Sequence, residues 1–502
     1  IHSLSSRLLT VYMRHPYEYF LGRHSGDLGS QILAETHKLV ETFFRPVTEA
    51  VASGLTVIAI VGLLIWIDPR VATVVFVFGG GIYVASYALS RNAVSRYGNV
   101  RAAANRERYR VANDVLTGVK EVKLLGRERS YIRTYAVASE KTARADADVG
   151  VIGQVPQYAM QIVAFGGMIV LSLALLDPVD LDRGRALPTL IPLLGVIAFA
   201  GQRLIPELSK LYWGITQLTY GAEIVDAFYN DLERGKALPP LPMNVAPMGL
   251  TRSLQLDNVR YSYPGVGNAG VADIKLNIAA GERIGIVGGS GSGKTTLADI
   301  IMGLLRIDSG EIIIDGNRIT DENIEAWQRT VGYVQQGIFL ADASISENIA
   351  LGLPAEQIDS FRIHEAARMA RLEHFVGELP EGYDTKIGER GVRISGGQRQ
   401  RIGIARALYN SADLLVFDEA TSALDTVTER EVMESIETLP GGKTVILIAH
   451  RLSTLKGCPR LIVLDRGKLV GDGSWEDLSE GNTYFRSLIN LDAAQPHQPQ
   501  SR

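Results

Sequence analysis

The chain has 502 residues, a formal net charge of -4 at pH 7 and a single cysteine, Cys458. The small net charge implies no nucleic-acid partner, and one cysteine excludes an internal disulfide and fits a reducing cytosol. A chain of this length can hold more than one domain, and its apolar residues are concentrated in its first half.

Four apolar runs lie in that half, and each is close to the roughly 20 residues that a helix needs to cross a bilayer. Strands buried in a soluble domain are much shorter. The runs are residues 51–67, 71–89, 155–176 and 187–205. We therefore predict four membrane-spanning helices, within a transmembrane domain over residues 1–232.

The connections between these runs differ in charge. Residues 91–147, between the second and third runs, are rich in lysine and arginine, which favours a cytosolic location. Two antiparallel helices of about 30 residues, each near 45 Å long, could fill this segment. They would turn near Gly118, where a short crosswise helix could contact another domain. A solvated charged face without a partner is the alternative.

A proline-rich stretch marks the end of the transmembrane domain. Pro239, Pro240, Pro242 and Pro247 lie close together without a regular spacing, which predicts an extended linker over residues 233–250. A second domain follows at 251–492. The last residues, 493–502, are polar and are predicted to be disordered.

The second domain opens with a pattern typical of nucleotide binding. Residues 288–295 read Gly-Gly-Ser-Gly-Ser-Gly-Lys-Thr, which fits the phosphate loop, Gly, four residues, then Gly-Lys-Ser/Thr. Apolar residues predict a strand before it and a helix after it; the alternative is a merely flexible turn. We predict that this loop binds the phosphates of ATP and that the Thr295 hydroxyl binds Mg²⁺. The predicted phosphate-binding residues are Gly288, Ser290, Gly291, Ser292, Gly293, Lys294, Thr295 and Thr296.

A second anion-binding surface lies about a hundred residues further on. Ser395, Gly396, Gly397 and Gln398, hereafter the signature segment, open a predicted helix that continues to about Leu408. A helix start favours anions, yet one active site does not need two such surfaces. We therefore predict that two copies of the chain meet head to tail, each supplying this surface to the other's nucleotide.

An apolar run then ends in two adjacent carboxylates. Residues 414–417 predict a buried strand that delivers Asp418 beside the phosphate loop, where it would bind Mg²⁺. Glu419 follows and would polarise the attacking water. These three motifs together predict ATP hydrolysis.

In this order, the motifs resemble the ATP-binding cassette (ABC) family, and the resemblance runs along the whole chain. It implies an α-helical transmembrane domain with long cytosolic extensions, joined to an α/β phosphate-loop domain with a helical subdomain. It also implies that Tyr263 stacks on adenine, that Gln336 contacts the metal and the attacking water, and that His450 contacts the terminal phosphate. Tyr261 and Gln335 are rivals for the first two roles. Residues 422–425 match the family's loop at the dimer interface.

Exporters of this family have six spans per subunit, which implies that about two helices precede Ile1. Residues 17–28 and 118–127 resemble their coupling helices. Tyr17, Tyr19, Gly26, the turn at 67–69 and residues 118–128 together are similar to bacterial flippases of lipid-linked oligosaccharides. The resemblance implies a transporter in the inner (cytoplasmic) membrane, with cytosolic ATPase domains, that moves an amphipathic, lipid-linked glycan. Because all the ATPase motifs are intact, we predict a homodimer; a heterodimer with a different chain is the alternative. A multidrug or lipid exporter, and an ATP-gated channel or regulator, are the alternatives.

Overall fold

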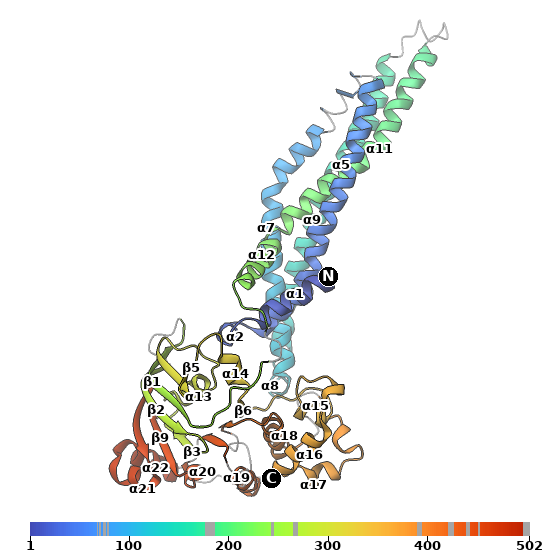
Figure 1. Cartoon of the computed structure of the whole chain (residues 1–502). Coiled ribbons are helices and arrows are strands. Elements are labelled where there is room, and N and C mark those ends of the chain that lie inside the picture. Colours follow the sequence, from blue (N-terminus) through green and yellow to red (C-terminus); the bar gives the residue numbers. More distant parts are fainter. Residues whose placement is uncertain are drawn as a thin grey trace. The chain divides into compact units, whose positions relative to one another are not determined.

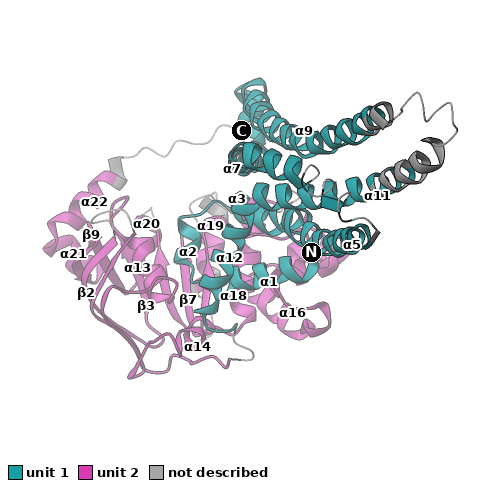
Figure 2. Cartoon of the chain, turned by 90° about the horizontal axis from the view of Figure 1, so that it is seen from above, with its two compact units in different colours: residues 1–241 teal, residues 242–502 magenta. Residues whose placement is uncertain are grey.

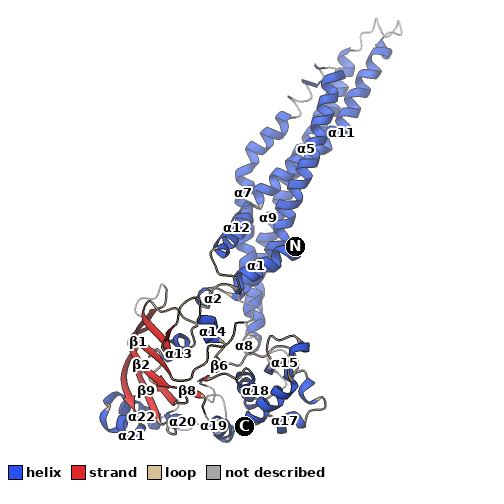
Figure 3. Cartoon of the chain, viewed as in Figure 1, coloured by secondary structure: helices blue, strands red, loops and turns tan. Residues whose placement is uncertain are grey.

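The computed structural model describes residues 1–67, 69, 72, 73, 77, 80–175, 186–241, 245–264, 270–388, 394–419, 426–437, 442–449 and 452–494. The chain divides into two compact units, residues 1–241 and residues 242–502, which Figure 2 shows in teal and magenta. Within the described residues, the first unit is built from helices, and the strands lie in the second unit (Figure 3).

Long helices make up most of the first unit (Figure 1). They are α5 (Arg45–Ile67), α7 (Gly81–Thr117), α9 (Glu128–Leu175) and α11 (Ala186–Tyr220). With 48 residues, α9 is about 72 Å long at 1.5 Å per residue. It packs along α7 and α11, and α11 also packs along α5.

The basic segment forms the long hairpin that its length and charge predict. α7 ends at Thr117, the short helix α8 (Val119–Leu124) follows, and α9 starts at Glu128. The turn lies at Gly118, whose N–H closes α7 by donating to the carbonyl oxygen of Asp114 at 2.9 Å. The prediction of two antiparallel helices with a short helix at their tip is therefore confirmed.

Shorter helices complete the first unit. They are α1 (His2–Met13), α2 (Glu18–Leu21), α3 (Ser25–Ser30), α4 (Thr36–Leu39) and α12 (Ala222–Lys236). Two π-helical turns, η1 (Gln31–Glu35) and η2 (Val40–Phe44), interrupt the continuous helix from α3 to α5. α12 packs against α1, where the Tyr12 hydroxyl donates to Asp231 at 2.6 Å, and α12 ends inside the predicted linker.

One helical stretch of the described residues, Gly26–Trp66, is long and apolar enough to cross a membrane by length and composition. It contains nearly all of the first predicted span, residues 51–67. The other three predicted spans, 71–89, 155–176 and 187–205, each include residues whose backbone or side chains lie outside the described part.

The second unit is organised around a six-stranded sheet of order β10-β9-β3-β8-β7-β6. Its strands are β3 (Arg283–Val287), β6 (Val331–Val334), β7 (Leu414–Asp418), β8 (Thr444–Ile448), β9 (Arg460–Asp465) and β10 (Lys468–Gly473). All pairs are parallel except β9 with β10. Because side chains alternate along a strand, Leu415 and Phe417 enter one core and Leu414 and Val416 the other. Because β3, β6, β7 and β8 are parallel, their carboxyl ends share one edge of the sheet, and ligands bind at this edge in such sheets.

A second, antiparallel sheet has the order β2-β1-β4-β5. Its strands are β1 (Ser253–Ser262), β2 (Gly270–Ala279), β4 (Ser309–Ile314) and β5 (Asn317–Arg318). The helices of this unit are α13 (Lys294–Ile301), α14 (Ile324–Gln328), α15 (Ile345–Ile349), α16 (Ser360–Met369), α17 (Glu373–Gly377), α18 (Gly396–Tyr409), α19 (Thr426–Glu437), α20 (Leu452–Leu455), α21 (Trp475–Gly481) and α22 (Thr483–Ala494), with short 3₁₀ turns at Ala355–Gln357 and Gly382–Asp384. α15 to α18 form a helical subdomain, in which α18 packs on α15 and α16 (Figure 1). Of the tail predicted to be disordered, 493–502, residues 493 and 494 belong to α22, so that part of the prediction is wrong, and residues 495–502 lie outside the described residues.

Candidate nucleotide-binding site

The phosphate loop joins β3 to α13, in the strand–loop–helix order that the motif requires. β3 ends at Val287 and α13 begins at Lys294. Gly291 and Gly293 have φ angles of +73° and +100°, in the left-handed region that favours glycine. A Cβ at Gly293 would also lie 3.2 Å from the carbonyl oxygen of Gly270. The glycines therefore hold a defined backbone path, and the loop is more than a flexible turn.

The side chain of Lys294 folds back onto this loop. Its Nζ donates to the carbonyl oxygens of Gly288 and Gly289, both at 3.0 Å. Burial lowers the pKa of the Lys294 ammonium, while the nearby carboxylates of Glu419 and Asp418 act in the opposite direction. The loop thus holds a buried amine close to two acids, which suits a site for a phosphate group with a bound cation.

Ser292 provides a second sign of an anion site. Its side chain is buried, and its Oγ has no hydrogen-bond partner among the described residues. A buried hydroxyl without a partner is unfavourable, so a ligand atom is expected to complete it. A phosphate oxygen of ATP fits this position within the loop.

β7 brings two carboxylates to the same edge of the sheet. Asp418 is the last residue of β7, is only 8% exposed, and accepts a hydrogen bond on Oδ2 from the Tyr333 hydroxyl at 3.4 Å. Glu419 has a φ of +51°, which is uncommon for a residue with a side chain, and its N–H donates to Ile448 at 2.8 Å. Such backbone strain occurs often at functional sites. The strand order thus explains how Asp418 and Glu419 approach the phosphate loop.

The residues present also fit Mg²⁺. Among the described residues, no group of three or more His, Cys, Asp and Glu side chains could hold a metal ion on its own. Mg²⁺ bound with a nucleotide commonly takes one or two protein oxygens and completes its shell with phosphates and water. The hydroxyl of Thr295, at the start of α13, and the carboxylate of Asp418 supply such a pair.

Tyr263 and Tyr261 occupy different environments. Tyr261 is 3% exposed and belongs to the core, so its ring faces are covered. Tyr263 is half-buried, packs edge-on against Tyr261 at 5.1 Å, and its hydroxyl lies 3.2 Å from that of Thr296 in α13. Of the two rivals, Tyr263 is the one whose ring is available to a base near the phosphate loop.

The two glutamines follow β6 directly. β6 ends at Val334, Gln335 is half-buried and Gln336 is exposed. β6 pairs with β7, so both glutamines lie at the sheet edge that carries Asp418. The exposed position of Gln336 leaves its side chain accessible to a ligand.

The signature segment starts α18 and is stabilised by a capping box. The N–H of Gln398 donates to the Ser395 Oγ at 3.2 Å, and the N–H of Ser395 donates to the Gln398 Oε1 at 2.8 Å. Ser395 and Gly396 are exposed, so the positive end of a 14-residue helix faces outward. This end belongs to the helical subdomain, whereas the phosphate loop belongs to the six-stranded sheet.

Two predicted elements cannot be placed. His450 and the segment 420–425, which includes the predicted interface loop, lie outside the described residues. β8 ends at Ile448, two residues before His450.

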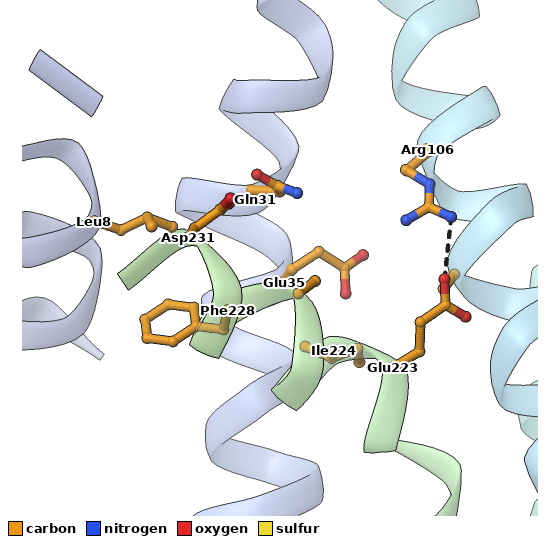
Figure 4. A pocket seen from close by; sticks show the side chains of 10 residues that line it. Leu8, Gln31, Glu35, Arg106, Glu223, Ile224, Phe228 and Asp231 are labelled. Atoms are coloured by element: carbon orange, nitrogen blue, oxygen red, sulfur yellow. Dashed lines mark hydrogen bonds and ion pairs between the residues drawn. The ribbon is translucent and has the colours of Figure 1, made fainter. Parts of the chain in front are cut away.

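A small cavity lies in the first unit, and Figure 4 shows its lining. Its volume is about 30 Å³, and Glu35, Glu223, Asp231 and Arg106 are among the residues around it. Arg106 pairs with Glu223 at 3.2 Å. This space suits one or two water molecules and is far too small for a nucleotide or a lipid.

Sequence reasoning missed two residues near the site. Tyr333 contacts Asp418 only because β6 and β7 pair, and no motif signals such a contact. Asp299 lies four residues after Thr295 and so on the same face of α13. Burial raises its pKa to about 6, and Asp418 adds to the effect. The four-residue spacing is the signal that could have identified Asp299.

A phosphate-loop ATPase with an inserted helical subdomain, joined to a unit of long helices, is the class of protein that this fold and site define. Comparison with protein families narrows the class. Residues 1–185 match the ABC transporter transmembrane region, and residues 271–422 match the ABC transporter family. The chain belongs to the ABC transporter family, it binds ATP, and it is an ATPase.

Named relatives align with nearly the whole chain. An ATP-dependent lipid A-core flippase of Alkalilimnicola ehrlichii is 33% identical over 483 residues, which are 95% of this chain and 80% of the relative. A protein of the same name from Pseudomonas aeruginosa is 30% identical over 504 residues, which are 99% and 81% of the two chains. A solved structure of a bacterial Atm1-family ABC exporter with ATP bound aligns with a TM-score of 0.83 and 25% identity, covering 98% of this chain and 86% of the other. These relatives place the chain among membrane ABC exporters.

Proposed function

We propose that the chain is an ATP-driven flippase that moves an amphipathic, lipid-linked glycan across the inner (cytoplasmic) membrane. Residues 1–232 are the transmembrane domain and residues 251–492 are a cytosolic ATP-binding cassette, joined by the linker 233–250. The names of the relatives support a lipid as cargo, since both are ATP-dependent lipid A-core flippases. The glycan follows from the resemblance of the loop segments to flippases of lipid-linked oligosaccharides.

One observation carries the proposal. The phosphate loop, Asp418 and Glu419 lie at one edge of the sheet, while the signature segment presents a separate, exposed helix start in the helical subdomain. Each subunit therefore carries two different phosphate-binding surfaces. A homodimer arranged head to tail would place the signature segment of one subunit against the nucleotide of the other.

The chemistry then divides among named residues. The ammonium of Lys294 binds the outer phosphates, and Tyr263 stacks on adenine. Mg²⁺, held through Thr295 and Asp418, would neutralise phosphate charge. The carboxylate of Glu419 accepts a proton from the attacking water, which Gln336 and His450 help to position. Closure of the dimer around two ATP molecules moves the coupling segments, and hydrolysis allows it to reopen.

The test compares the parent with Glu419→Gln in liposomes that contain a fluorescent lipid-linked sugar. General-base assistance is typically worth about 10²–10⁴-fold, so we expect ATP turnover to fall by that factor while ATP binding persists. Flipping should stop with turnover. Unchanged hydrolysis would remove Glu419 from the role of base, and turnover that is insensitive to every glycolipid tested would reject the cargo.

A further inference from the structure

α19 contacts both α18, the helix of the signature segment, and α20, the helix that follows His450. Its start follows Glu419 after the six residues 420–425, and two of its side chains, Val432 and Ile436, are buried in the core. The burial of these two side chains anchors α19 in the core of the second unit. The polar contacts of α19 connect it to other helices of the cassette.

Arg401 connects α19 to α18, the helix that the signature segment opens. Arg401 lies in α18, six residues after Ser395, and its guanidinium forms an ion pair with Glu431 of α19. The Arg401 side chain is only 19% exposed, and it also donates to the carbonyl oxygen of Arg371 at 3.0 Å. A planar guanidinium held by two acceptors fixes direction as well as distance.

A second pair repeats this connection one helical turn along. Arg371, in the turn between α16 and α17, donates to Glu434 of α19 at 2.9 Å. Glu431 and Glu434 are three residues apart and so lie on one face of α19. The helical subdomain therefore contacts α19 through two ion pairs, one at Glu431 and one at Glu434.

A third contact reaches α20, which begins two residues after His450. The Thr454 hydroxyl donates to Glu429 of α19 at 2.8 Å. α19 is therefore bonded to α18, which Ser395 caps, and to α20, which follows His450, and it is the next described helix after Glu419.

We propose that Arg401 and Glu431 are positioning residues for ATP hydrolysis: their ion pair, acting through α19, sets the signature segment relative to Glu419. This inference rests on the proposed function, in which the signature segment serves the partner's nucleotide and Glu419 serves its own. The ion pair links these two halves of the machinery within one subunit, so that the two nucleotide sites of the dimer are held in register.

The test uses the full chain in liposomes with the variants Arg401→Gln, Glu431→Gln, the double variant, and the charge swap Arg401→Glu with Glu431→Arg. We expect each single variant to lower kcat about tenfold, because groups that act through one contact lose its whole effect when either is removed. KM for ATP should stay within about twofold of the parent, since the phosphate loop is untouched. The double variant should be no slower than either single variant, and the swap should recover part of kcat.

Arg318 and Glu311 provide the matched control. They form an ion pair at 3.0 Å in the same unit, between β5 and β4, and lie outside the phosphate loop, the signature segment and α19. Arg318→Gln should leave kcat unchanged. Single variants of Arg401 and Glu431 that melt at lower temperature but keep the parental kcat would overturn the inference, as would losses that multiply in the double variant. If Glu419→Gln turns over like the parent, the proposed function fails; if only the Arg401 and Glu431 variants do, this inference alone fails.

Discussion

Asp299 is a single residue whose protonation is linked to the stability of the cassette. Burial raises its pKa from 3.8 to about 6, so the folded chain binds this proton more tightly than the unfolded chain. The stability that this proton confers is fully present below pH 3.8 and is lost as the pH rises through 6. At pH 8 the folded chain therefore bears the cost of a half-buried carboxylate.

Replacing this carboxylate should make the cassette more stable at high pH. We expect Asp299→Asn to raise the free energy of unfolding at pH 8 by about 1 kcal/mol, after allowance for solvent screening of a side chain that is partly exposed. The gain should nearly vanish at pH 4. Thermal unfolding of the nucleotide-free protein at the two pH values measures both. A lower melting temperature for Asp299→Asn at pH 8 would show that the carboxylate is compensated by its neighbours.

Local spacing explains which site residues the sequence could reveal. Lys294, Thr295 and Asp418 belong to motifs in which a few neighbouring residues suffice, and the structure places them at one edge of the sheet. Tyr333 enters the site through pairing of β6 with β7, and the positive φ of Glu419 depends on its bond to Ile448. Such long-range causes leave no pattern in a single sequence.

Among the elements, the start of α18 has two proposed roles, helix capping and phosphate binding. Substitutions of Ser395, the residue that caps α18, can separate them. Ser395 caps the helix and also belongs to the predicted phosphate-binding surface. Ser395→Ala removes both the cap, which is worth about 1 kcal/mol, and the hydroxyl. Ser395→Asp keeps a good capping group but places a negative charge where a phosphate would bind. We expect the Asp variant to melt close to the parent while its ATP turnover falls at least as far as that of the Ala variant.

A second capping box offers the control for this experiment. Ser344 starts α15 in the same subdomain and forms the same reciprocal bonds, with Glu347. Ser344→Ala should lower the melting temperature to a similar extent and leave turnover unchanged. Turnover in Ser395→Asp equal to that of the parent would mean that the helix start does not face a nucleotide.

Element prediction succeeded where composition and length sufficed. The charged segment of about 60 residues is long enough for two antiparallel helices, and α7, α8 and α9 follow that expectation. The π-helical turns η1 and η2 were not predicted, because they shift the helical register by one residue without changing the apolar pattern around them. The order of strands in the antiparallel sheet was also beyond reach, since it depends on pairing between residues far apart in the chain.

At the scale of the whole molecule, the proposed head-to-tail dimer predicts that two inactive variants regain ATP hydrolysis when they share a dimer. Lys294→Ala damages the phosphate loop, and Ser395→Arg damages the signature segment, so neither homodimer should hydrolyse ATP. When the two are mixed and reassembled, random pairing makes about half of the dimers mixed, and each of these has one intact site, giving about a quarter of all sites. We therefore expect phosphate release to reappear on mixing.

The arrangement of residues within each site supplies the decisive control. In the proposed dimer, Lys294 and Glu419 act on the same nucleotide from the same subunit, so a mixture of Lys294→Ala with Glu419→Gln contains no intact site in any pairing. That mixture should stay inactive at every ratio. Recovery in both mixtures, or in neither, would contradict a nucleotide cage divided between two subunits, because only that division makes the outcome depend on which pair of residues is changed.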